Sequence, residues 1–322
     1  MPSFAYHRPD SLRDALDRLA LDGARPLSGG TDLLVALEEE VEHATHLVDL
    51  RRIPGAREIT RSTDGGVRIG AAARLADIAT HADVGARWPA LAQACDAVGT
   101  TALRHMGTLG GNLCQRPRCW YLRRNIPCLK NGGPSCPAED GENRYLAILG
   151  GGPCHAVHPS DPAVALTALD AQVEIAGAGA TRRVAMSAFY APPRADVTRE
   201  TALTAGEIVT AVELPATSAG GRQRYDKVMQ RGAWDFALVS LAACRREDGD
   251  VRLVLGGVGP RPWRVDHSVE QDVASGGLSV EDVATLADRA LYDARPLRDN
   301  DYKIALAAAL LRRAMTDLTT RL

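Results

Sequence analysis

The feature that most constrains this fold is the middle stretch of residues 104–159, in which neither a helical nor a strand period of apolar residues can be found. Glycine, proline, cysteine and arginine dominate it. Loops of this length without secondary structure are uncommon inside compact domains, because ordering the backbone costs entropy that few buried side chains offset. We therefore expect a ligand or a metal to organise this stretch.

Four cysteines of the stretch form the first candidate site. Four thiolates complete either a tetrahedral zinc site or a [4Fe-4S] cluster. Structural zinc sites usually use two tight Cys-x-x-Cys pairs, which are absent here, whereas wide single spacings suit the larger cubane. The spacing favours the cluster and leaves zinc as the alternative. The candidate ligands are Cys119, Cys128, Cys136 and Cys154, with eight, seven and seventeen residues between them.

Positive charge accompanies these cysteines. Residues 116–130 contain no acidic residue. A thiolate-ligated cluster has net negative charge, which nearby cations offset. A solvated basic loop or a partner-binding patch is the alternative. The cations are Arg116, Arg118, Arg123, Arg124 and Lys130.

The other three cysteines have simpler interpretations. Cys95 lies on the apolar face of a predicted helix and Cys244 ends an apolar strand, so we expect both in the core. Cys114 precedes Cys119 by few residues; we expect a small buried thiol there, with a fifth ligand as the alternative. An odd number of cysteines favours metal over disulfides in a reducing compartment.

Two glycine-rich turns form the second candidate site. Residues 28–32 (Ser-Gly-Gly-Thr-Asp) lie between a predicted strand and helix, and residues 107–112 (Gly-Thr-Leu-Gly-Gly-Asn) repeat the same chemistry. Glycine lets backbone N–H groups approach an anion, so the pair suits the two halves of a pyrophosphate. Residues 158–161 (His-Pro-Ser-Asp) add polar groups at a helix start. Ligand-free turns and an ordinary N-cap are the alternatives.

Composition excludes several classes of protein. Of 322 residues, 45% are apolar and 24% charged, as in ordinary globular proteins, and the formal net charge is −2. This charge argues against nucleic acid as the main partner. No window is apolar enough to insert into a membrane, and the first residues lack the apolar core of a secretory signal. We expect a cytoplasmic protein, or a periplasmic one if a partner subunit carries the export signal.

Patterns outside the middle stretch predict an α+β fold in which strands and helices are partly segregated. A polar linker at residues 215–221 places a domain boundary near residue 218. We expect helices at 10–20, 33–40, 75–81, 89–98, 162–169, 279–292 and 300–318, and strands at 25–27, 47–50, 58–60, 67–70, 172–175, 182–184, 207–214, 225–229, 237–244 and 251–256.

The motifs together resemble the FAD-binding medium subunit of the xanthine dehydrogenase and carbon monoxide dehydrogenase family of molybdenum hydroxylases. The resemblance rests on residues 26–33, 107–113 and 158–161. Residues 115–154 resemble an insert found in a subgroup with an additional [4Fe-4S] cluster. That subgroup includes bacterial aldehyde oxidoreductase flavin subunits and the medium subunit of 4-hydroxybenzoyl-CoA reductase.

The resemblance implies a vanillyl-alcohol-oxidase-like (PCMH-type) FAD-binding domain at residues 1–218. Its two subdomains would span about 1–55 and 56–218, with the cluster insert at about 114–156. A C-terminal domain at residues 219–322, similar to that of carbon monoxide dehydrogenase flavoproteins, would have a small antiparallel sheet and helices.

The resemblance also implies an electron-transfer subunit of an oxidoreductase. Electrons would leave substrate at a molybdenum cofactor in a large subunit, cross two [2Fe-2S] clusters in a small subunit, and reach FAD in this chain and then an external acceptor. The assembly would be a heterotrimer or a dimer of heterotrimers. No residue of this chain would be catalytic beyond the flavin. A self-sufficient FAD enzyme and a zinc-stapled interaction module are the alternatives.

Residue roles follow from the resemblance alone. Lys227 and Arg231 would lie near the isoalloxazine, with two exposed cations on a strand edge as the alternative, and Trp234 would shield the ring or pack at the domain junction. Leu50 would lie near the adenine, and Ser160 and Asp161 near the ribitol. The pyrophosphate would lie between two sets of residues: Leu27, Ser28, Gly29, Gly30, Thr31, Asp32 and Leu33 on one side, and Thr108, Gly110, Gly111 and Asn112 on the other.

Overall fold

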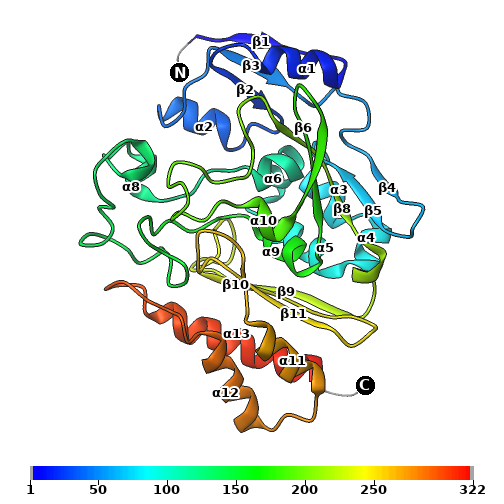
Figure 1. Ribbon diagram of the computed structural model, residues 1–322, viewed down its shortest axis with the longest axis vertical. Helices are drawn as coiled ribbons and strands as arrows, with labels where there is room; N and C mark the ends of the chain where they lie inside the picture. Colours follow the sequence, from blue (N-terminus) through cyan, green and yellow to red (C-terminus); the bar gives the residue numbers. More distant parts are fainter. Residues whose placement is uncertain (1–2, 320–322) are drawn as a thin grey trace.

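The computed structural model describes residues 3–319, which form three β-sheets arranged along the long axis of the molecule (Figure 1). The first sheet lies at one end and is parallel, with the strand order β1-β3-β2. The predicted strand, glycine turn, helix and strand are confirmed here. The elements are β1 (Ala5–His7), α1 (Leu12–Leu19), β2 (Ala24–Leu27), α2 (Leu33–Glu38) and β3 (His46–Asp49).

The second sheet is central and antiparallel, with the order β4-β5-β8-β6-β7. Both predicted hairpins are confirmed, because β4 pairs with β5 and β6 with β7. The elements are β4 (Ile59–Arg61), β5 (Val67–Gly70), α3 (Leu75–Ala79), α4 (Ala82–Arg87), α5 (Pro89–Asp96), α6 (Thr101–Met106), α7 (Leu109–Leu113), α9 (Asp161–Ala168), β6 (Gln172–Ala176), β7 (Thr181–Ala185), α10 (Met186–Phe189) and β8 (Ile208–Leu214).

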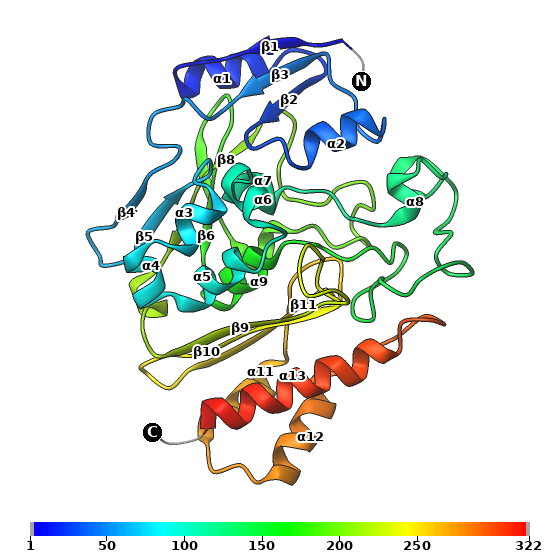
Figure 2. The ribbon, with the colours of Figure 1, turned by 180° about the vertical axis from the view of Figure 1, so that it is seen from behind.

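The third sheet is antiparallel, with the order β12-β11-β10-β9, and separates two layers of helices. Helices α5 and α9 pack on one face, and α11 and α13 on the other (Figure 2). The elements are the short helix η2 (Ala216–Ser218), β9 (Arg222–Val228), β10 (Val239–Arg245), β11 (Val251–Gly256), β12 (Trp263–Arg264), α11 (His267–Ser275), α12 (Val280–Ala290) and α13 (Tyr302–Thr319). Among the described residues, no helix is long and apolar enough to cross a membrane.

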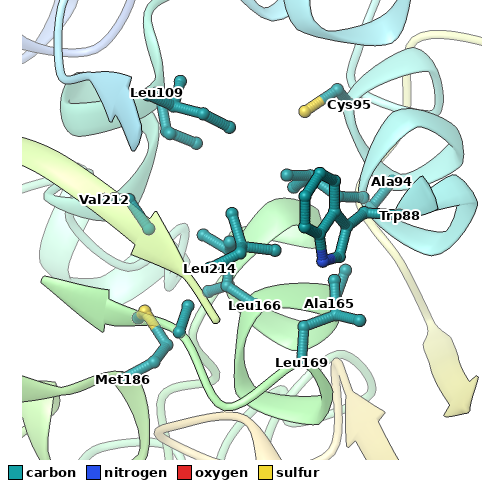
Figure 3. Close-up of a cluster of buried hydrophobic side chains, with 14 of the residues drawn as sticks. Trp88, Ala94, Cys95, Leu109, Ala165, Leu166, Leu169, Met186, Val212 and Leu214 are labelled. Carbon is teal, nitrogen blue, oxygen red and sulfur yellow. The ribbon is translucent and has the colours of Figure 1, made fainter. Parts of the chain in front are cut away.

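The main core lies between the central sheet and α5 and α9 (Figure 3). Trp88 is fully buried there, and its indole N–H donates to Ser218 Oγ at 3.0 Å. Every residue of α9 is buried, and apart from Asp161 and Thr167 its sequence is apolar on all sides rather than on one stripe. Cys95 and Cys244 are buried in this core, as predicted.

The middle stretch is mostly irregular, as predicted, and lies along one flank of the molecule (Figure 2). It contains α7, α8 (Trp120–Arg123) and the short helix η1 (Leu129–Asn131). Residues 143–149 of the stretch are tied to the C-terminal helices: Lys303 Nζ on α13 donates to the carbonyls of Tyr145, Leu146 and Gly257 at 2.8, 3.0 and 2.8 Å. Tertiary hydrogen bonds therefore replace local secondary structure in this segment.

Several short elements escaped the sequence prediction. No helix was expected over α4, α6, α7, α8, α10 or α11, and no strand over β1 or β12. The linker expected at residues 215–221 contains η2, and β9 begins at Arg222, earlier than predicted. Except for α11, which has nine residues, these elements are short, and such segments carry too few residues for a period to stand out.

Candidate functional site

A cavity of about 810 Å³ lies where the two glycine turns meet the central sheet. Residues 28–33 of the first turn line it, as do Thr108, Gly110, Gly111 and Asn112 of the second. Asp161, at the N-terminus of α9, also lines it, as does Leu50 beyond β3. The structure therefore brings the separate sequence motifs into one cavity.

Two predicted residues do not line this cavity. Leu27 is buried in the core of the first sheet. Ser160 is buried and caps α9, accepting from the Ala163 amide at 3.1 Å, which is the N-cap role that the sequence left open. The Ser160 hydroxyl also donates to Asn112 Oδ1 at 2.6 Å. Ser160 thus positions a cavity residue without facing the cavity itself.

The glycines permit the two turns to touch each other. A Cβ at Gly29 would lie 2.1 Å from the Met106 carbonyl oxygen, and one at Gly110 would lie 2.8 Å from Ala71 Cβ. A Cβ at Gly111 would meet only Thr108 Oγ1, at 3.0 Å. Gly29 and Gly110 are therefore required by packing, whereas Gly111 leaves its space open toward the cavity.

Ser28 supplies an unused polar group in the cavity wall. Its hydroxyl is buried and has no hydrogen-bond partner among the described residues. A buried hydroxyl without a partner costs free energy, so it marks a place where a ligand oxygen would be favoured.

Asp32 uses its carboxylate to hold the chain that follows the second glycine turn. Its Oδ1 lies 2.7 Å from the Arg123 guanidinium and 2.9 Å from that of Arg118. Its Oδ2 accepts from the Arg116 amide at 2.9 Å. The side chain therefore binds the cysteine-containing segment, although the residue also lines the cavity.

The cations near the cysteines are paired with acids from elsewhere in the chain. Besides the pairs at Asp32, Arg116 contacts Glu42 at 2.6 Å and Glu200 at 3.2 Å. Lys130 contacts Glu200 at 3.1 Å. We expected the positive charge of these residues to offset a negatively charged cluster. This is wrong in part, because acidic residues far away in the sequence already neutralise much of that positive charge.

Lys227 and Asp161 form a buried ion pair in the cavity wall. Their Nζ and Oδ2 atoms are 2.8 Å apart, and both side chains are about 5% exposed or less. Lys227 also donates to the Ala97 carbonyl at 2.9 Å, and the Tyr225 hydroxyl donates to Asp161 Oδ1 at 2.6 Å. Burial raises the pKa of Asp161, and these two donors oppose that rise. The alternative of an exposed cation is wrong for Lys227.

Cationic and aromatic side chains surround the cavity beyond Lys227. Arg231 is 64% exposed, and its guanidinium lies 5.8 Å from the Trp234 ring centre. The Arg118 guanidinium lies 5.0 Å from the ring centre of Phe236. All four residues line the cavity. Trp234 is 63% exposed, so it lies at the edge of the cavity and does not pack in a domain junction.

Sequence reasoning missed a polar group on the central sheet. Arg68 and Glu174 form an ion pair at 2.7 Å, and the Thr210 hydroxyl donates to Glu174 at 2.7 Å. All three line the cavity. They come from β5, β6 and β8, so only strand pairing brings them together. The sequence hinted at this group only by placing a polar residue in each of three strands whose residues alternate between apolar and polar.

The four candidate cysteine ligands line one small cavity of about 10 Å³. This space is about that of one water probe, so a cubane would require the sulfurs to move apart. Within residues 3–319, no group of three or more His, Cys, Asp or Glu side chains has the arrangement of a metal-ion site. Apolar groups complete the lining: Tyr121, Leu122, Leu129, Pro137 and Ala156, with Lys130.

Cys114 lies apart from these four cysteines. It lines the large cavity and not the small one. Burial raises the pKa of its thiol to about 12. Cys114 is therefore placed beside the second glycine turn, as expected, but it is partly rather than fully buried.

Comparisons with known proteins match this chain to subunits of molybdopterin-dependent dehydrogenases and oxidoreductases. Residues 2–217 match the family described as the FAD binding domain in molybdopterin dehydrogenase. The aldehyde oxidoreductase FAD-binding subunit PaoB of Escherichia coli K12 is 38% identical over 97% of this chain and 96% of its own length. The glyceraldehyde dehydrogenase medium chain of Sulfolobus acidocaldarius is 29% identical over 93% of this chain and 91% of its own.

Solved structures share the fold. A carbon monoxide dehydrogenase chain from Hydrogenophaga pseudoflava superimposes with a TM-score of 0.76 at 25% identity, covering 98% of this chain and 96% of that chain. A quinoline 2-oxidoreductase chain from Pseudomonas putida 86 gives a TM-score of 0.76 at 24% identity, covering 99% and 97%. The PCMH-type fold expected from the sequence is confirmed.

Proposed function

This chain belongs to the family of FAD-binding domains of molybdopterin dehydrogenases, and we propose that it is the electron-transfer subunit of an aldehyde-oxidising molybdenum hydroxylase. It is an oxidoreductase subunit, as the sequence predicted. In the proposed role it takes electrons that leave the substrate in a partner subunit and delivers them to an external acceptor.

The cavity between the glycine turns is the observation that carries this proposal. Its volume of about 810 Å³ is within the range of small-molecule and cofactor pockets. The unpaired Ser28 hydroxyl of the first turn suits a diphosphate oxygen. In the second turn the amides of Leu109, Gly110 and Asn112 already donate within the chain, so its glycines supply space beside the cavity rather than free N–H groups. The residues present therefore fit FAD.

The remaining contacts set the proposed orientation. Lys227, Arg231 and Trp234 lie toward the β9–β10 loop, where we place the isoalloxazine, and Leu50 lies toward the first sheet, where we place the adenine. When bound, FAD supplies the two-electron redox chemistry, and this chain binds and orients it. The ion pair of Lys227 and Asp161 keeps one cation fixed in the cavity wall.

We also assign a [4Fe-4S] cluster to Cys119, Cys128, Cys136 and Cys154. All four side chains line one cavity among apolar residues, which supports a shared ligand. Four thiolates are the usual donor set for such a cluster, whose chemistry is one-electron transfer.

The domains and partners belong to the same proposal. The strands of the three sheets fall within residues 5–49, 59–214 and 222–264, which supports subdomains at about 1–55 and 56–218 and a C-terminal domain at 219–322. The partners are a large subunit with the molybdenum cofactor and a small subunit with two [2Fe-2S] clusters. Relatives named medium chains of aldehyde-oxidising and carbon monoxide dehydrogenases support this assembly.

Aldehyde is the substrate class we favour for the complex. The relative at 38% identity is named for an aldehyde oxidoreductase, and that at 29% for a glyceraldehyde dehydrogenase. A 4-hydroxybenzoyl-CoA-reductase-like complex is the second candidate for the cluster-carrying insert. A flavin-free zinc module does not agree with membership in an FAD-binding family.

The test is a visible spectrum of the anaerobically purified chain, together with iron, zinc and flavin analysis. We expect a flavin band over a broad iron–sulfur absorbance, with four irons per chain if the cluster is complete. A colourless, zinc-containing protein would refute the proposal. Co-purification with the native partners and aldehyde-dependent bleaching of the flavin band would then test the substrate class.

A further inference from the structure

Asp32 is the place where the two proposed cofactor sites meet. It lines the large cavity at the end of the first glycine turn. Its carboxylate is 16% exposed and is held by Arg123, Arg118 and the Arg116 amide at 2.7, 2.9 and 2.9 Å. The Arg123 side chain is only 10% exposed. Asp32 thus belongs to the first glycine turn, while its carboxylate binds the segment that contains Cys119.

All three donors lie close to Cys119 in the chain. Arg116 and Arg118 precede this cysteine, and Arg123 ends the short helix α8 that follows it. Asn125 adds a further contact with the C-terminal end of α2 by donating to the Glu39 carbonyl at 3.0 Å. The donors are therefore in place only while the segment around Cys119 is folded.

We propose that Asp32 is a positioning residue that couples the two sites, so that loading the cysteine cavity with its cluster strengthens FAD binding. This inference rests on the proposed function. In the folded segment, two guanidinium groups neutralise the carboxylate. If the segment loosens, an unpaired negative charge remains in the wall of the cavity, beside the turn that faces the diphosphate, and repels it. Linkage requires that FAD strengthens cluster binding by the same factor.

The test is titration of FAD into the full chain in two forms, one loaded with iron and sulfide and one stripped by a chelator without oxygen. For the natural chain we expect the FAD dissociation constant to rise by about tenfold on stripping, a typical coupling factor. Asp32→Asn removes both the negative charge and the ion pairs. In this variant the ratio of the FAD dissociation constant of the stripped form to that of the iron-loaded form should therefore fall to about one.

Two further variants separate coupling from general damage. Glu213→Gln removes the ion pair with Arg183 at 2.8 Å, and neither residue lines the large cavity or the cysteine cavity, so the natural ratio of dissociation constants should persist. Arg123→Met should raise the dissociation constant of the iron-loaded chain toward that of the stripped chain. This second variant decides the question if Asp32→Asn does not fold.

The titrations separate a failure of the proposed coupling from a failure of the proposed function. Equal dissociation constants in the two forms of the natural chain, or an unchanged ratio in Asp32→Asn, overturn the coupling while FAD and iron binding stand. A natural chain that takes up neither FAD nor iron overturns both the coupling and the function.

Discussion

Lys227 on β9 reaches Asp161 at the N-terminus of α9, with Nζ and Oδ2 2.8 Å apart and both side chains almost fully buried. The two residues belong to the third sheet and to the helical layer of the main core. Their ion pair therefore fastens the C-terminal sheet to the wall of the cavity.

Lys227→Met should destabilise the protein by about 3–5 kcal/mol, because it leaves the Asp161 carboxylate buried without its cation. The free energy of unfolding in urea measures the effect. The double variant with Asp161→Asn is the control and should regain part of the loss, since no unpaired charge is then buried. A single variant within about 0.5 kcal/mol of the natural chain, the range of ordinary surface changes, would contradict the argument.

Gly111→Val should abolish flavin retention, with a smaller loss of stability than a substitution at Gly110. Its added side chain would face the cavity and meet only Thr108 Oγ1 at 3.0 Å. The valine side chain would occupy space in the cavity where we place the diphosphate. The flavin band of the purified chain measures the result.

Gly110→Val is the matched comparison for that experiment. Its Cβ would lie 2.8 Å from Ala71 Cβ, so we expect loss of both flavin and stability. Normal flavin content in Gly111→Val would remove the second glycine turn from the FAD site.

Much of the fold followed from local patterns. The hairpin of β6 and β7 was predictable because alternating apolar residues flank a glycine-containing tip. Helix α7 was harder, since Gly110 and Gly111 lie within it and glycine weakens helices. The Thr108 side chain caps it by accepting from the Gly111 amide at 3.4 Å, which tertiary contacts reinforce.

The site was predictable only where a motif is contiguous. The two glycine turns could be read directly, and both line the cavity. The cations near the cysteines are neutralised by Glu42 and Glu200. Both acids are far away in the sequence, and no pattern in residues 116–130 predicts their contacts. Arg68 and Glu174 likewise meet only after the central sheet forms. Such long-range charge pairing is decided by tertiary structure and has no local signature.

Cys128→Ala and Cys136→Ala should each lower the iron content of the chain and loosen the middle segment, because both line the small cysteine cavity. Iron analysis and the rate of limited proteolysis measure the two effects. Cys95→Ala is the control: Cys95 is fully buried in the main core, so this variant should keep its iron. Natural iron content in the first two variants would refute the ligand assignment.

Acid should weaken the first sheet through Asp49. Burial alone would raise the pKa of this carboxyl, but hydrogen bonds from Arg51 and Tyr6 hold it at about 2, below its ordinary value of 3.8. A lowered pKa in the folded state means that the stabilisation is complete well above pH 4 and is lost as the pH falls toward 2. At about 1.4 kcal/mol for each pKa unit, Asp49 contributes about 2 kcal/mol at neutral pH.

The stability gap between the natural chain and Asp49→Asn, measured by urea unfolding from pH 7 to pH 2, tests this directly. We expect the gap to be widest at neutral pH and to close on acidification, because the protonated carboxyl resembles the amide. Tyr6→Phe removes the 2.6 Å hydrogen bond to Asp49, while Arg51 keeps its own contacts at 2.8 and 2.9 Å. In a Tyr6→Phe background, the stability gap between the chain that keeps Asp49 and its Asp49→Asn variant should therefore be narrower. A gap that stays constant over this range would show that Asp49 does not titrate with folding.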